Sequence, residues 1–155
     1  MTLSNFIKST LLAAFITVYG SSNAQEKPNV IIIYTDDQGS IDLNIYGAKD
    51  LQTPNMDALV KSGVRFTQFY GAPVCSPSRA GLLTGKTPQR AGVPGNVPSV
   101  PVTTRGLKSE QYTMAEMFKD AGYTTAHIGK WHLGDQKGML PNDQGFDYSF
   151  GHHVG

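Results

Sequence analysis

The chain has 155 residues, a formal net charge of +1 and 39% hydrophobic residues. This near-neutral balance supplies no basic field, so it excludes the charge signature of a protein that binds nucleic acid or an acidic membrane surface. The 17 glycines and 9 prolines predict many loops around a small buried core.

The N-terminal residues 1–24 have the features of a secretory signal peptide. Lys8 supplies positive charge, an apolar run covers residues 11–19, and residues 22–24 form a small-x-small cleavage site. An uncleaved N-terminal anchor is the alternative, although the apolar run is short for a membrane span. We therefore expect a mature protein that begins near Gln25, is periplasmic or secreted, and has no membrane contact after cleavage.

Residues 28–35 form a continuous apolar, β-branched run, which predicts a strand buried on both faces of a parallel sheet. Asp36 and Asp37 follow directly. Sites in open α/β sheets gather at the carboxyl ends of strands. Paired carboxylates at such an end favour a hard divalent cation, Ca²⁺ or Mg²⁺, and a solvated turn is the alternative.

The next elements continue an alternating pattern. Residues 53–63 predict a helix with Thr53 as its cap, Pro54 at its first position and Gly63 at its end. Residues 64–70 alternate apolar and polar side chains, which predicts a strand. A β–α–β–α order of this kind predicts an α/β layered fold.

Residues 74–85 predict a short helix that contains the only cysteine. Pro77 suits its first turn, and Gly85 is suited to end it. Cys75 then lies at the N-terminal end of the helix, where partial positive charge favours an anion. Arg79 follows one turn later on the same face. A buried structural cysteine beside a surface arginine is the alternative. In an oxidising compartment a lone cysteine has no internal disulfide partner, so it is free, paired with another chain or modified.

The second half of the chain predicts a loop, a helix and a strand. Residues 86–111 are rich in Pro, Gly, Val and Thr and predict a long loop with one or two short strands. A capping box at residues 113–116 predicts a helix that ends at Gly122. Residues 123–128 predict a buried strand. Within it, His127 is either a core residue or a residue that contacts the site residues without touching the substrate.

Two pairs of side chains near the C-terminal end are candidates for anion chemistry. Lys130 and His132 lie two apart after the strand, so in extended chain they point the same way. Together they can hold an anionic leaving group and protonate it, and a basic surface loop is the alternative. His152 and His153 begin a further loop and are candidates for substrate contact, and a transition-metal site is the alternative.

Several of these motifs resemble the sulfatase family. Residues 75–85 fill every fixed position of the signature Cys-x-Pro-Ser-Arg-Ala-x-Leu-x-Thr-Gly. Residues 122–132 fill every fixed position of the second signature, Gly-Tyr-x-Thr-x-x-x-Gly-Lys-x-His. The paired aspartates after the first predicted strand and the run at residues 145–151 also resemble the family, so the resemblance covers residues 27–151.

The resemblance implies a fold and a domain organisation. It implies an α/β fold of the alkaline-phosphatase-like type, with a mixed sheet sandwiched between helices. Sulfatases run to several hundred residues, so residues 25–155 would be the N-terminal part of a truncated catalytic domain. The part beyond residue 155 would hold the other calcium ligands, a further lysine and the leaving-group acid, and the fragment alone would be inactive.

The resemblance also implies roles for the candidate residues. A formylglycine-generating enzyme would convert Cys75 to formylglycine, whose hydrate is the nucleophile. Ca²⁺, rather than Mg²⁺, would bind Asp36, Asp37 and modified Cys75. Arg79 and Lys130 would stabilise the hydrate and the sulfate charge, and His132 would polarise or deprotonate the hydrate. Residues that would contact substrate are Lys130, His152 and His153.

The expected function is hydrolysis of sulfate esters of a small molecule or carbohydrate. Three other functions stay open. The first is a formylglycine-dependent phosphonate or phosphate monoester hydrolase of the same superfamily. The second is an inactive truncated fragment that only binds a cation. The third is a thiol-dependent metal-binding protein with unmodified Cys75.

Overall fold

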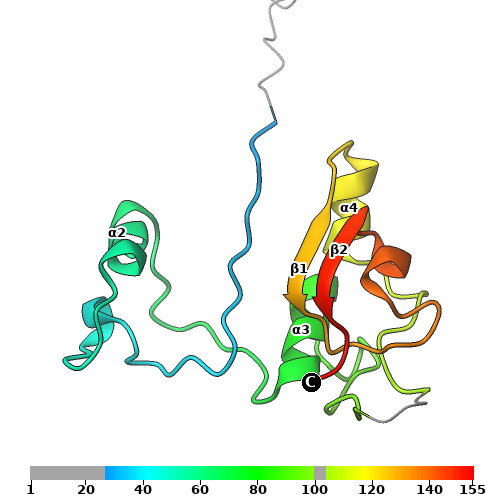
Figure 1. The fold of residues 1–155 in the computed structure, drawn as a ribbon, viewed down its shortest axis with the longest axis horizontal. Helices are drawn as coiled ribbons and strands as arrows, with labels where there is room; N and C mark the ends of the chain where they lie inside the picture. The colour runs from blue at the N-terminus through cyan, green and yellow to red at the C-terminus, as the bar shows by residue number, and fades with distance from the viewer. Residues whose placement is uncertain (1–26, 100–103) are drawn as a thin grey trace, which may run out of the picture. The chain divides into compact units, whose positions relative to one another are not determined.

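A computed structural model describes residues 27–99 and 104–155, so the predicted signal peptide lies outside the described residues. The chain divides between Thr35 and Asp36 into two units. In the described ranges, no helix is both long and apolar enough to cross a membrane. The regular elements described lie in the second unit (Figure 1): η1 Asn44–Tyr46, α2 Pro54–Ser62, α3 Cys75–Thr84, α4 Met114–Asp120, β1 Ala126–Lys130, η2 Pro141–Gln144 and β2 Tyr148–His152.

Helix α3 forms as the sequence predicts. Val74 is extended immediately before it, and Pro77 lies in the first turn, where a missing N–H costs little. The helix ends at Gly85, whose φ of 65° is left-handed and whose N–H donates to the Gly81 carbonyl at 2.9 Å. The buried face of α3 comprises Ser76, Pro77, Ala80 and Leu83.

The predicted capping box starts helix α4. The Thr113 hydroxyl accepts a hydrogen bond from the Glu116 N–H at 3.2 Å, and the Glu116 carboxylate accepts one from the Thr113 N–H at 2.7 Å. Thr113 also donates to the Gln144 carbonyl at 2.8 Å, which ties the helix start to η2. The helix ends at Asp120, close to the predicted stop at Gly122.

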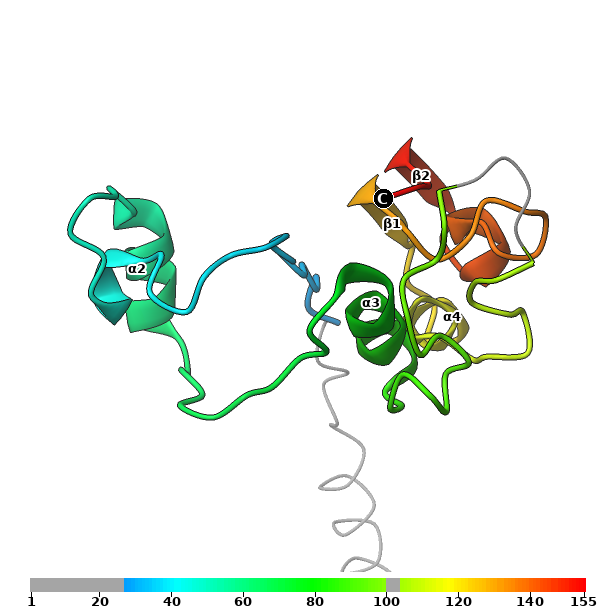
Figure 2. The same cartoon turned by 90° about the horizontal axis from the view of Figure 1, so that it is seen from below.

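The sheet of the second unit has two parallel strands. Strand β1 pairs with β2 from Ala126 opposite Tyr148 to Lys130 opposite His152. The predicted strand at residues 123–128 is therefore shifted, because the Thr125 N–H bonds the Asp147 carboxylate at 3.0 Å instead of a neighbouring strand. Figure 2 shows α3 and α4 packed side by side on one face of this strand pair.

A cluster of apolar side chains joins α3, the following loop and the segment after β1. Trp131, Leu107 and Leu133 are among its most deeply buried members. The Trp131 indole N–H donates to the Met139 carbonyl at 2.8 Å, so its one polar group is satisfied inside the core. The other buried members are Ala80, Leu83, Ala91, Val93 and Val97.

Two predicted strands are not found. Residues 28–35 and 64–70 have no strand assignment, and their side chains are exposed, as Ile31 at 84% and Phe69 at 79% illustrate. A strand needs a neighbour to receive its backbone hydrogen bonds, and no described strand pairs with either segment. Helix α2 forms at its predicted place and contacts η1, but none of its residues is buried, and Leu59 is 62% exposed.

The described part of the long loop after α3 also lacks the short strands predicted for it. Residues 86–99 and 104–111 contain turns and bends but no strand. Buried side chains anchor the loop instead, among them Val93 and Val97. This anchoring brings the loop to the start of α3.

Candidate functional site

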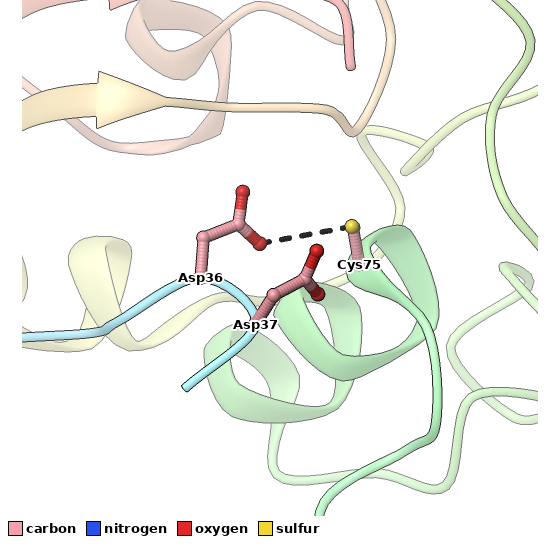
Figure 3. Close-up of side chains that lie close together, drawn as sticks. All are labelled: Asp36, Asp37 and Cys75. Atoms are coloured by element: carbon pink, nitrogen blue, oxygen red, sulfur yellow. Dashed lines mark hydrogen bonds between the residues drawn. The ribbon is translucent and has the colours of Figure 1, made fainter. Parts of the chain in front are cut away.

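Two aspartates and the cysteine converge at the start of α3. Figure 3 shows Asp36 and Asp37, on consecutive residues of one segment, facing Cys75 in the first turn of the helix. One ligand atom from each of the three lies within 4.8 Å of the others. The Cys75 thiol donates to Asp36 Oδ1 with a sulfur-to-oxygen distance of 3.7 Å. The three groups are therefore close enough to share one cation.

The backbone at Asp37 helps to bring both carboxylates to one place. Its φ of 53° lies in the left-handed region, which aspartate adopts more readily than most residues. Both aspartates are exposed, whereas Cys75 is half-buried. The site is thus open to solvent on the carboxylate side.

Two cations surround the Asp36 carboxylate. Lys130 Nζ lies 2.9 Å from Asp36 Oδ2 and 3.4 Å from Cys75 Sγ. Arg79 Nη2 lies 3.6 Å from Asp36 Oδ1, and Arg79 Nη1 donates to the Lys130 carbonyl. Arg79 is one turn after Cys75 on α3 and Lys130 is the last residue of β1, so helix and strand each supply one positive charge to the same place.

The carboxylate of Asp36 and the ammonium group of Lys130 stabilise each other in their charged forms. The hydrogen bond from Lys130 is the main cause that lowers the pKa of Asp36, with further help from the positive charges of Lys130 and Arg79. The same hydrogen bond is the main cause that raises the pKa of Lys130. Carboxylate and ammonium therefore both stay charged over a wide pH range around neutrality.

His132 is buried, and the charges of Lys130, Arg79 and Asp36 act on it. Its φ is 54°, so the chain is not extended there, and the prediction that Lys130 and His132 point the same way loses its premise. The ring Nε2 lies 2.9 Å from the Val97 carbonyl instead. Burial is the main cause that lowers the pKa of His132, so a neutral imidazole is favoured.

The other histidines occupy two different environments. His127 is half-buried and packs edge-on against Trp131 and Phe146 at the border of the core, with ring centroids 5.2 and 5.5 Å apart. Burial is the main cause that lowers the pKa of His127. His152 is exposed at the end of β2, directly opposite Lys130, and the half-buried His153 follows it. Their carbonyls accept hydrogen bonds from the backbone N–H groups of Trp131 and His132.

Sequence reasoning missed the residues that hold the start of α3. Asn96 Oδ1 accepts a hydrogen bond from the Ser76 N–H at 3.1 Å, and Ser76 Oγ accepts one from the Val97 N–H at 3.0 Å. The sequence contains a signal for this arrangement. Val74 precedes the helix and has no side-chain acceptor, so the exposed N–H groups of the first turn need one from elsewhere.

The chain is similar to proteins of one known family. The profile of the sulfatase family matches residues 28–155. The chain belongs to the sulfatase family. It is 40% identical to the arylsulfatase of Klebsiella aerogenes, over 92% of this chain and 32% of that protein. It is 39% identical to the N-acetylgalactosamine-6-sulfatase of Canis lupus familiaris, over 85% of this chain and 27% of that protein.

A solved structure supports the fold of this sulfatase chain. The crystal structure of Ps i-CgsB aligns with a TM-score of 0.79 and 39% identity, over 84% of this chain and 29% of that one. The predicted α/β, alkaline-phosphatase-like fold class is thereby confirmed for this N-terminal part. The chain spans 27–32% of the length of these relatives.

Proposed function

We propose that this chain carries part of the active site of a sulfuric ester hydrolase. The observation that carries the proposal is the convergence of Cys75 with one carboxylate and two cations. Lys130 Nζ lies 3.4 Å from the sulfur, and Arg79 reaches the Asp36 carboxylate beside it. Such a setting favours an anion next to residue 75, as attack on a sulfate ester requires.

The donor set fits a hard cation once residue 75 supplies oxygen. Asp36, Asp37 and residue 75 form the cluster of potential ligands found among the described residues. Thiolate is a soft ligand that suits Ca²⁺ poorly, whereas carboxylates and the oxygens of an aldehyde hydrate suit it well, and Mg²⁺ demands stricter geometry. Bound there, Ca²⁺ supplies positive charge that favours an anionic oxygen at residue 75.

The ligand count also supports a longer catalytic domain. Calcium takes about six to eight oxygen ligands, and three residues supply fewer even with a bidentate carboxylate. We infer that residues 25–155 form the N-terminal part of a larger domain, called the intact enzyme below. Its other part would supply the remaining ligands, a further lysine and the acid that protonates the leaving group.

The proposed nucleophile is an oxygen on residue 75. A formylglycine-generating enzyme, with molecular oxygen as the oxidant, would oxidise the Cys75 side chain to an aldehyde and break its C–S bond, so that the sulfur leaves as sulfide. Water converts the aldehyde to a hydrate. One hydrate oxygen attacks sulfur, and the bond from sulfur to the alcohol oxygen breaks as the alcohol takes up a proton. The second hydroxyl then loses its proton, the aldehyde C=O re-forms, and the bond to the sulfate oxygen breaks to release sulfate. Water restores the hydrate.

Residues of this chain would bind and orient the reacting groups. Arg79 and Lys130 would balance the charge of the hydrate and the sulfate, since both already border Asp36. His132 would accept the proton of the hydrate, because burial favours its neutral form. His152 and His153 would contact the substrate beyond Lys130, since the end of β2 lies beside the end of β1.

The proposed substrate is a sulfated carbohydrate or small molecule. Ps i-CgsB, a solved relative with 37% identity in this comparison, has also been crystallised in complex with k-i-k-neocarrahexaose. The relatives named above include one N-acetylgalactosamine-6-sulfatase. The signal-like residues 1–24 support a periplasmic or secreted enzyme.

The experiment compares three esters in the intact enzyme, produced together with a formylglycine-generating enzyme. We expect turnover of an activated aryl sulfate to exceed that of the matching phosphate monoester and phosphonate. The peptide that contains residue 75 should lose the mass difference between a CH₂SH and a CHO group and should react with a hydrazide. Faster turnover of a phosphorus ester would replace the proposed substrate class.

Matched variants assign the turnover to this site. Cys75→Ala should abolish it, and Arg79→Met should lower it by about 10²–10³-fold. Arg90→Met is the control, because Arg90 is an exposed arginine on the following loop. Full turnover in Cys75→Ala, or an unchanged thiol mass in active enzyme, would contradict the proposal. The 155-residue chain alone should show no turnover, because ligands and the acid are missing.

A further inference from the structure

The start of α3 is capped from a distant loop. Val74, the residue before the helix, makes no side-chain cap. Asn96, 20 residues from Ser76, accepts from the Ser76 N–H, while the Ser76 hydroxyl accepts from the Val97 N–H. The two bonds are reciprocal, as in a capping box, but they join two separate segments. They hold the turn that contains Cys75 against the loop at residues 96–97.

The same loop fixes the ring of His132. A carbonyl oxygen only accepts hydrogen bonds, so the 2.9 Å contact with the Val97 carbonyl requires a hydrogen on Nε2. In the neutral imidazole Nδ1 is then the bare acceptor. Nδ1 is buried, and among the described residues it has no hydrogen-bond partner.

A buried acceptor without a partner is unfavourable unless a donor meets it. His132 is only 6% exposed, Val97 5% and Ser76 0%, so bulk water reaches none of these side chains freely. The hydroxyl of the hydrate proposed at residue 75 is a donor of the required kind. Residues 96 and 97 therefore form hydrogen bonds with the helical turn that contains residue 75. They also bond to His132, the base that would receive the proton of the hydrate.

We propose that Asn96 is a positioning residue that aligns Cys75 and, through Val97, sets the tautomer of His132. This inference rests on the proposed function for its catalytic consequence, but its structural content does not. Asn96 is exposed, so its replacement opens no cavity in the core. Removal of its carbonyl frees the Ser76 N–H, loosens residues 96–97 and lets the His132 ring populate both tautomers.

The first experiment reads the tautomer directly. Nitrogen-15 labelling of the four histidines of the 155-residue chain, at a pH where imidazole is neutral, distinguishes a protonated ring nitrogen from a bare one. We expect the wild type and Asn96→Asp, which keeps an acceptor, to show His132 protonated at Nε2. Asn96→Ala should show a mixture, with Ser76 amide exchange at least about tenfold faster.

Two further variants keep this test decisive. Ser76→Ala removes the acceptor of the Val97 N–H without touching Asn96, and it should also release the tautomer. Gln89→Ala, an exposed amide on the same loop, should change neither signal. An unchanged His132 signal in both Asn96→Ala and Ser76→Ala would overturn the inference. Equal disturbance in Asn96→Asp and Asn96→Ala would also overturn it, since the acceptor would then be irrelevant.

The second experiment measures the catalytic consequence in the intact enzyme. Asn96→Ala should lower kcat by about ten- to a hundredfold with little change in KM, because misplacement of reacting groups acts on the chemical step. Asn96→Asp should restore most of it. If the tautomer responds but wild type hydrolyses no sulfate ester, the proposed function fails and the positioning stands. If the wild type hydrolyses a sulfate ester but the tautomer does not respond to the variants, the positioning role fails and the proposed function stands.

Discussion

Residues 75–155 contain every member of the hydrophobic core cluster, whereas in residues 36–74 Leu43 is the one buried apolar side chain. In the first region Leu107, Trp131 and Leu133 are at most 1% exposed, packed around α3 and the strand pair. In the second, Phe66 is 71% exposed and Tyr70 86%. A hydrophobic sequence thus produces a core only where other elements of the chain are present to cover it.

This difference divides the candidate site. Cys75, Arg79, Lys130 and His132 lie on or directly beside elements that contribute to the core. Asp36 and Asp37 lie on an exposed segment, and hydrogen bonds and ion pairs to the packed region hold Asp36 in place. We therefore expect the positions of Arg79, Lys130 and His132 to depend on the stability of the core. The positions of Asp36 and Asp37 should depend instead on electrostatic contacts with the packed region.

The largest expected effect compares one leucine from each region. Leu133→Ala should lower the free energy of unfolding by about 2–5 kcal/mol, since Leu133 is fully buried in the core. Leu59→Ala, the same chemical change on the exposed face of α2, should stay within about 0.5 kcal/mol. Denaturant titration followed by the fluorescence of the single tryptophan, Trp131, measures both. Equal losses would mean that the two regions do not differ as described.

A second prediction concerns the cation ligands in the intact enzyme. Calcium at about a hundredfold excess over its dissociation constant should stabilise the wild type by about 2.7 kcal/mol, a shift visible in thermal unfolding. Asp37→Asn should remove most of that shift, because the amide lacks the charge of the ligand. Asp50→Asn, an exposed aspartate of the same region, is the control and should keep it. A shift retained in both Asp37→Asn and Asp36→Asn would exclude these ligands.

The cap of α4 provides a smaller test of the packed region. Thr113→Ala should cost about 1–2 kcal/mol, because it removes both the cap of the Glu116 N–H and the donor to the Gln144 carbonyl. Thr113→Ser keeps the hydroxyl and should recover most of this loss. Chemical denaturation monitored by circular dichroism measures the difference. A serine variant as unstable as the alanine variant would refute the capping argument.

The smallest effect is a pH dependence from His127. Burial is the main cause that lowers the pKa of His127 below its ordinary 6.5, and the charges of Arg79 and His153 act in the same direction. The unfolded chain then binds the proton more readily than the folded one. The stability contribution is therefore full above about pH 6.5 and is lost as the pH falls through the folded pKa.

His127→Phe removes this group while it keeps an aromatic ring against Trp131 and Phe146. The stability of the wild type should fall between pH 7 and pH 5 more steeply than that of the variant. Equilibrium unfolding at a series of pH values measures both slopes. Parallel slopes would show that protonation of His127 is not linked to folding.

Local signals in the sequence predicted the local structures well. The caps and stops of α3 and α4 depend on residues within a few positions of each other, so Pro77, Gly85 and the Thr113 box located both helices. The predictions at residues 28–35 and 64–70 failed because they assumed partners that periodicity alone does not identify. The motif pattern also selected Cys75, Arg79 and Lys130, which the structure brings together around Asp36.

By itself, the sequence determined where helices begin and end, the family of the chain and which side chains are candidates for chemistry. Only the tertiary structure decided which of them meet. Asp36 lies 39 residues from Cys75 and Lys130 lies 55, so their contacts arise from packing that no local pattern encodes. It also decided that His132 bonds to Val97 and that Asn96 caps α3, because a buried N–H takes its acceptor from whatever segment the fold places beside it.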